Sequence, residues 1–102
     1  MNLLRLSEEE IKSIKNIARK IFGEDCKIWI FGSRTNPDLK GGDIDIYIEV
    51  KDYIIYQILD KKIQFLLELK DSIGEQKIDV IIKPLGFDEE FGLNIKKSGV
   101  LL

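Results

Sequence analysis

Apolar and polar positions alternate along the chain with two different periods, and each stretch of one period predicts one element. Apolar residues recur every three or four positions over 11–22, after a Ser7 and Glu10 pair typical of a helix capping box. The same helical spacing returns over 53–72 and, for a shorter stretch, over 87–95. The pattern therefore predicts three helices.

Three other stretches predict β-strands. Residues 27–31 are rich in strand-forming side chains, and 77–83 are a strand-like run that Pro84 ends. Residues 43–50 alternate strictly from one position to the next. One face of this strand would carry Asp43, Asp45, Tyr47 and Glu49, and the other would carry Ile44, Ile46, Ile48 and Val50.

The long helix between the second and third strands is a crossover connection. It predicts an α/β (α+β) fold, a small mixed β-sheet with helices packed on one face. A chain of 102 residues suits a single domain over 1–102 with one modest core, since 44% of its residues are apolar. The opposite face of the sheet, with Asp43 and Asp45, would be left open, which is unusual unless a ligand or another protein uses it.

Composition narrows the chemistry. The chain has no histidine, which excludes Ser-His-Asp and Cys-His catalysis and every histidine-based zinc site. Cys26 is the only cysteine, so no internal disulfide or cysteine-rich metal cluster can form, and we expect it to pack as a small apolar residue. Catalysis here would have to use carboxylates, lysines, hydroxyls or a hard metal.

Charge and hydropathy give the wider expectations. The net charge of −2 argues against a general nucleic-acid binder. The apolar runs are too short to span a bilayer, and no secretory signal is visible at the N-terminus. A cytoplasmic protein is the default expectation.

The candidate chemistry centres on three carboxylates. Asp43 and Asp45 lie two apart on a strand, so they point the same way, about 6.6 Å apart along it. Asp79 joins them if its strand pairs in the register that faces it outward. Two carboxylates about 4 Å apart repel by roughly 4 kcal/mol at an effective dielectric near 20, so the group needs protonation, separation or a cation. Oxygen ligands alone favour Mg²⁺ or Mn²⁺ over zinc, and two such ions could brace both oxygens of a phosphoryl displacement.

A Gly32-Ser33 turn follows the first strand. Gly32 would let the backbone approach a triphosphate closely, Ser33 would offer an N–H and a hydroxyl to its phosphates, and Arg34 could neutralise phosphate charge. Each feature alone has a plainer explanation, because Gly-Ser turns are common and an Asp-x-Asp pair can be the solvated face of a strand. Their order and spacing in a strand–turn–strand context favour the nucleotide site.

The stretches Phe31-Gly-Ser-Arg34 and Gly42-Asp-Ile-Asp-Ile46 resemble the signature of the DNA polymerase β-type nucleotidyltransferase superfamily. The small size resembles its minimal nucleotidyltransferase branch, and the likeness runs from the first helix to the last residues, which implies a polymerase β-like core. Nine residues separate Ser33 from Asp43, one fewer than is common in antitoxin members, and Gly41-Gly42 replaces a usual serine.

By motif, the resemblance implies a role for each matching residue. Gly32 and Ser33 would hold the triphosphate, and Asp43 and Asp45 would bind the metal ions. Asp79 would complete the catalytic metal site and help to activate the attacking hydroxyl.

The resemblance also implies a partner. Many minimal nucleotidyltransferases are encoded beside an α-helical HEPN-domain protein, as toxin–antitoxin pairs in which the antitoxin transfers AMP from ATP to a tyrosine of the toxin. Two alternatives stay open: a catalytically silent antitoxin that binds nucleotide and neutralises its partner by contact alone, and a transferase acting on a small-molecule acceptor. Tyr53, Tyr56, Phe87 and Phe91 are candidates for a partner surface, although core packing is the alternative for the two phenylalanines.

Overall fold

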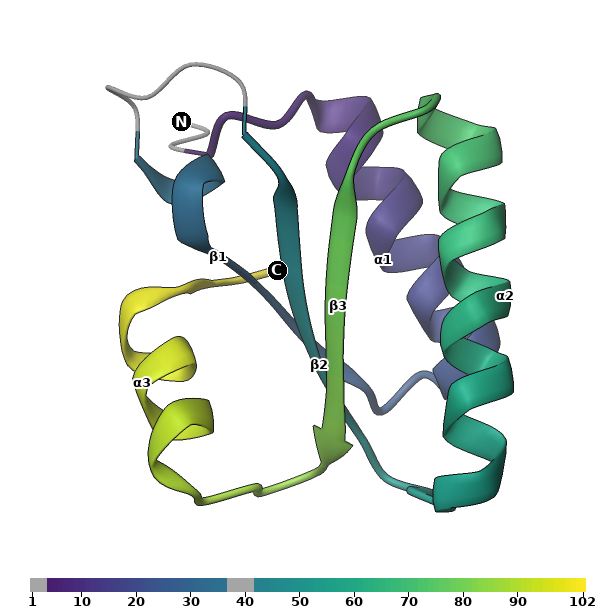
Figure 1. The fold of residues 1–102 in the computed structure, drawn as a ribbon, viewed down its shortest axis with the longest axis vertical. Helices are drawn as coiled ribbons and strands as arrows, with labels where there is room; N and C mark the ends of the chain where they lie inside the picture. The colour runs from purple at the N-terminus through teal and green to yellow at the C-terminus, as the bar shows by residue number, and fades with distance from the viewer. Residues whose placement is uncertain (1–3, 37–41) are drawn as a thin grey trace.

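The computed structural model describes residues 4–36 and 42–102, and in these ranges it contains three α-helices and a four-stranded sheet (Figure 1). In chain order the elements are α1 (Glu8–Phe22), β1 (Lys27–Phe31), the 3₁₀ helix η1 (Gly32–Thr35), β2 (Ile44–Val50), α2 (Ile55–Ile73), β3 (Ile78–Pro84), α3 (Glu90–Ser98) and β4 (Val100–Leu101). Every predicted element forms close to its predicted bounds, and the two-residue β4 is an addition.

Local sequence explains where α1 begins. The Ser7 hydroxyl accepts the Glu10 N–H at 3.0 Å, and the Glu10 carboxylate accepts the Ser7 N–H at 2.9 Å, so two otherwise unpaired donors of the first turn are satisfied. The predicted capping box is therefore confirmed, and α1 ends before Gly23.

The sheet has the strand order β3-β2-β1-β4. β1 runs antiparallel to both β2 and β4, whereas β2 and β3 are parallel and are joined by α2. This is the small mixed sheet that the crossover helix predicted. The register sets Asp45 of β2 opposite Phe31 of β1 on one side and opposite Asp79 of β3 on the other.

The hydrophobic core lies between one face of the sheet and the two long helices. α1 contributes Ile14, Ala18 and Phe22, α2 contributes Ile58, Phe65 and Leu69, and the strands contribute Ile28, Ile30, Ile44, Ile46, Ile48, Val50, Ile78, Val80 and Ile82. Cys26 is buried in the same cluster, as expected. Across the described ranges, no helix combines the length and apolar character that crossing a membrane requires.

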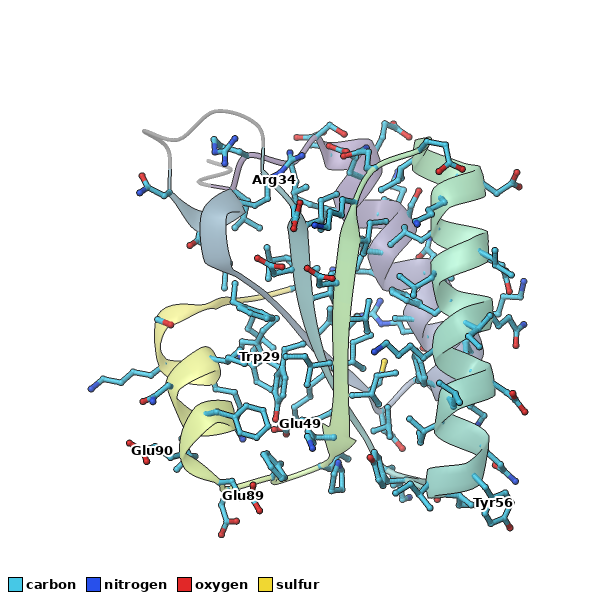
Figure 2. The ribbon with its side chains drawn as sticks, viewed as in Figure 1. Trp29, Arg34, Glu49, Tyr56, Glu89 and Glu90 are labelled. Atoms are coloured by element: carbon cyan, nitrogen blue, oxygen red, sulfur yellow. The ribbon has the colours of Figure 1, made fainter. Side chains whose placement is uncertain are left out.

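α3 lies against part of the other face of the sheet (Figure 2). There Lys96 of α3 forms an ion pair of 2.8 Å with Glu49 of β2, and Tyr47 donates its hydroxyl to the same carboxylate at 2.8 Å. The Trp29 and Tyr47 rings pack beside them, 5.6 Å apart between centroids. The two long helices pack on one face as predicted, and α3 covers the second face where β2 ends, away from the aspartates at the start of β2.

Candidate active site

The start of β2 and the facing part of β3 bring two carboxylates together. The parallel register sets Asp45 directly beside Asp79, and both point away from the core because their neighbours Ile44, Ile46 and Ile78 are buried. Burial raises the pKa of Asp45 above its ordinary value, and the nearby charges of Asp79 and Asp43 raise it further. Asp45 is therefore protonated more readily than an isolated, exposed aspartate.

Asp43 lies just before β2 and faces Lys77, with 3.6 Å between its Oδ2 and the lysine Nζ. In the part of the chain that the structure describes, no three histidine, cysteine, aspartate or glutamate side chains are gathered closely enough to hold one metal ion as they stand. The donor chemistry nevertheless suits a hard divalent cation. Asp45 and Asp79 supply oxygen ligands, and a cation there would relieve the repulsion that raises the pKa of Asp45.

Gly32 is the first residue of η1 and lies against the Asp45 carboxylate. Its φ of +76° lies in the left-handed region that glycine adopts at low cost. A Cβ added to Gly32 would also overlap the carboxylate of Asp45. The predicted helical turn after β1 does form, and the Thr35 hydroxyl closes it by donating to the Gly32 carbonyl at 2.7 Å. The Ser33 side chain lies outside what the structure describes, so its predicted role stays a prediction.

Arg34 is placed by hydrogen bonds to protein groups. Its guanidinium donates to the carbonyls of Arg5 at 2.6 Å and Gly42 at 3.3 Å and to the Gln76 side chain at 3.4 Å, and Gln76 in turn donates to Glu10. Its buried Nε has no hydrogen-bond partner among the described residues. Figure 2 shows Arg34 near the starts of α1 and β2. Arg34 thus ties the Gly-Ser turn to the residue preceding Asp43, and its predicted contact with phosphate remains a prediction.

Sequence reasoning missed the buried polar network around Glu49, toward the other end of β2. Burial alone would raise the pKa of Glu49, but hydrogen bonds from Lys96, Tyr47 and the Gly86 N–H outweigh burial and hold that pKa below its usual value. The same burial and the Glu49 carboxylate raise the pKa of Tyr47. The alternation in β2 placed Glu49 and Tyr47 on the second face, but nothing in the sequence indicated that α3 would cover them.

Comparison with known proteins adds one finding to this geometry. The family model described as "Polymerase beta, Nucleotidyltransferase" matches residues 9–102, which include Gly32 and all three aspartates. No curated protein matches the chain significantly.

Proposed function

Because the chain belongs to the polymerase β nucleotidyltransferase family, we propose that it transfers AMP from ATP to a hydroxyl of a partner protein. The family supports nucleotidyl transfer in general. The more specific proposal is that the acceptor is a tyrosine of a HEPN-type toxin and that the transfer makes this chain the antitoxin. The observation that carries the catalytic part is the pairing of Asp45 with Asp79 beside the left-handed turn at Gly32.

Each residue of the site would have a different role in this reaction. The acceptor hydroxyl oxygen forms a bond to the α-phosphorus of ATP, the bond from that phosphorus to the bridging oxygen breaks, and pyrophosphate leaves with the electron pair. The proton of the hydroxyl passes to the carboxylate of Asp79, which is exposed on the open face and can reach an incoming acceptor. Gly32 and Ser33 would hold the triphosphate in line with that attack.

Asp43, Asp45 and Asp79 would hold Mg²⁺ or Mn²⁺, which neutralises charge on the transferring phosphoryl group and orients it. Asp43 would exchange its ion pair with Lys77 for the cation, which is a small rearrangement because 77% of the Lys77 side chain is exposed and it can turn into solvent. Without a cation, burial and then the charges of Asp79 and Asp43 raise the pKa of Asp45.

A protein acceptor is supported by the openness of this part of the sheet. α3 covers the second face around Glu49 and Tyr47 but leaves Asp79 exposed, so a large surface can approach the carboxylates. A small acceptor would need walls that hold it, and the described elements over this face, α3 and the loop before it, lie toward the other end of β3. A protein partner can bring its own binding surface.

The first experiment incubates the purified chain with ATP, Mg²⁺ and the product of the neighbouring gene, and then measures the intact mass of both proteins. We expect the partner to gain one or more AMP units, and we expect no gain with Asp43→Asn. A stable, silenced complex without any gain in mass would instead favour an antitoxin that acts by contact alone. Transfer to a small hydroxyl compound, with the partner unmodified, would favour the small-acceptor alternative.

Gly32→Ala should lower transfer on the order of a hundredfold. The added methyl group must displace the Asp45 carboxylate, and alanine at this positive φ also costs about 1–2 kcal/mol of stability. The rate of AMP transfer and the thermal midpoint measure the two effects separately.

Gly23→Ala is the matched control. Gly23 also has a positive φ, of +104°, but an added Cβ would meet nothing within 4 Å. It should lose comparable stability and keep its transfer rate. Equal rates in the two variants would show that Gly32 has no special role at the site.

A further inference from the structure

One side of the molecule exposes apolar side chains that the core does not use. Exposed apolar residues along α2 are Ile55, Tyr56, Leu59, Ile63 and Leu67. A shallow groove of about 330 Å³ lies between α2 and β3, and its lining includes Ile55, Leu59 and Ile81. Figure 1 shows α2 alongside β3, the outermost strand on that side of the sheet. We call α2 from Ile55 to Leu67 together with the outer edge of β3 the edge surface.

The outer edge of β3 presents unpaired main-chain groups. Ile44 donates its N–H to the Lys77 carbonyl, and Leu85 donates to Val50, so odd-numbered residues of this segment turn their main-chain groups toward β2. The even-numbered residues therefore turn theirs outward. Within the described ranges β3 pairs with β2 alone, so Val80 and Ile82 offer free donors and acceptors to another strand.

We propose that the edge surface binds a second copy of this chain, with the two β3 strands antiparallel and Ile81 on the twofold axis. Val80 of each copy then lies opposite Ile82 of the other, and these are the residues whose main-chain groups point outward. The interface would be the same surface on both copies, which is the commonest form of homodimer.

Charge complementarity selects this register. Asp79, Ile81 and Lys83 share one face of β3, and a twofold axis at Ile81 sets Asp79 opposite Lys83 of the second copy, twice. An axis at Asp79 or at Lys83 would set like charges opposite each other. An axis at Val80 would set Lys77 opposite Lys83, and an axis at Ile82 would leave Asp79 opposite Leu85 without a charged partner. Of these registers, only the one centred on Ile81 sets opposite charges across from each other. It also sets Pro84, which has no N–H, opposite Ile78, so that pair forms one main-chain hydrogen bond whereas each pair of Val80 with Ile82 can form two.

The apolar side chains of α2 fit the same arrangement. Leu59 lines the groove beside β3, so the twofold axis brings the two α2 helices next to each other on the core side of the joined sheet. Leu59 and Ile63, which are 64% and 48% exposed, would then be buried against their counterparts. Each copy would also place Lys83 beside Asp79 of the other, at the border of the carboxylate site. The dimer does not depend on the transfer reaction.

The test is the molar mass of the full chain in solution, measured by light scattering and sedimentation up to roughly 100 µM, where a weak dimer still forms. We expect twice the monomer mass of 11.8 kDa. Lys83→Glu should weaken the dimer about tenfold or more. The substitution sets a carboxylate opposite Asp79 of the other copy, and the twofold axis repeats this repulsion once more. The double variant Asp79→Lys with Lys83→Glu should restore the dimer, because opposite charges again face each other in both pairs.

Lys97→Glu is the control, since Lys97 is an exposed lysine of α3 away from the edge surface. Leu59→Gln should also weaken the dimer while leaving each fold intact, because Leu59 is exposed in the monomer. A wild-type chain that stays monomeric overturns the proposal, even if another protein binds the edge surface. A dimer that Lys83→Glu leaves unchanged overturns it equally.

Discussion

Asp45→Asn is expected to abolish nucleotidyl transfer while leaving the fold at least as stable as the wild type. Asp45 lies beside Asp79 in the register, and its carboxylate lies against Gly32, so it connects the proposed cation site with the triphosphate turn. Loss of a charged ligand there should slow transfer on the order of a thousandfold, which corresponds to about 4 kcal/mol of barrier. Asparagine also removes one of the mutually repelling charges, so the thermal midpoint should stay equal or rise.

Two measurements separate this outcome from simple misfolding. The rate of AMP transfer is compared with the thermal midpoint, and each midpoint is measured with and without Mg²⁺. The ion should raise the midpoint of the wild type, because binding to the folded state stabilises it, and should lose this effect in Asp45→Asn. Asp88→Asn, an exposed carboxylate in the loop before α3, should match the wild type in every measurement. Transfer within a few-fold of wild type in Asp45→Asn would contradict the site.

Lys96→Met is expected to cause the largest loss of stability among single changes to a polar group. Glu49 has a side chain only 3% exposed, and Lys96 is its one cationic partner among the described residues. Methionine keeps most of the apolar stem near the Trp29 ring but leaves the buried carboxylate without its counter-ion. We expect a loss of about 3 kcal/mol, or a midpoint lower by roughly 15 °C in a domain of this size.

The chain offers a matched control for this change. Lys20 forms an ion pair of 2.7 Å with Glu68, but 66% of the Lys20 side chain is exposed. Lys20→Met should therefore cost less than about 1 kcal/mol. The double variant Lys96→Met with Glu49→Gln should recover part of the loss, because no unpaired charge then remains buried. Equal losses from Lys96→Met and Lys20→Met would show that α3 is held by apolar contacts alone.

The pH dependence of Lys96→Met has a definite sign. In the wild type the pKa of Glu49 is lowered, so its contribution to stability is present above the unfolded pKa of about 4.3 and is lost as the pH falls through the lower folded value. Without Lys96, burial dominates and the folded pKa of Glu49 rises. Protonation of Glu49 then removes the buried, unpaired charge. The difference in unfolding free energy between wild type and variant should therefore shrink as the pH falls from 7 toward 4.

Local patterns predicted the elements of this chain well. The capping box at Ser7 and the strict alternation of β2 depend only on neighbouring residues, and both are present in the structure. The pairing of Asp45 with Asp79 needed one more fact, the register of β3. The sequence alone does not determine this register, because Asp79 could have faced either side of the sheet.

Tertiary placement accounts for what the patterns could not predict. The apolar positions of α2 formed one set in the sequence, whereas the structure buries Ile58 and Leu69 and exposes Leu59 and Ile63. Helical spacing shows that such residues share a broad face but not how much of it the sheet covers. The partnership of Lys96 with Glu49 was invisible for a similar reason, since 47 positions separate the two residues and nothing local marks them as a pair.

The alternation of β2 also determines where this domain can tolerate insertions and deletions during evolution. An extra residue before Asp43 leaves the order of side chains along β2 intact, so the connection after η1 is free to vary in length among relatives. Deletion of Ile46 would instead move every residue on one side of it to the opposite face, setting either the aspartates into the core or the isoleucines into solvent. Length changes in related domains should therefore collect before the first aspartate and be absent from Asp45 to Val50.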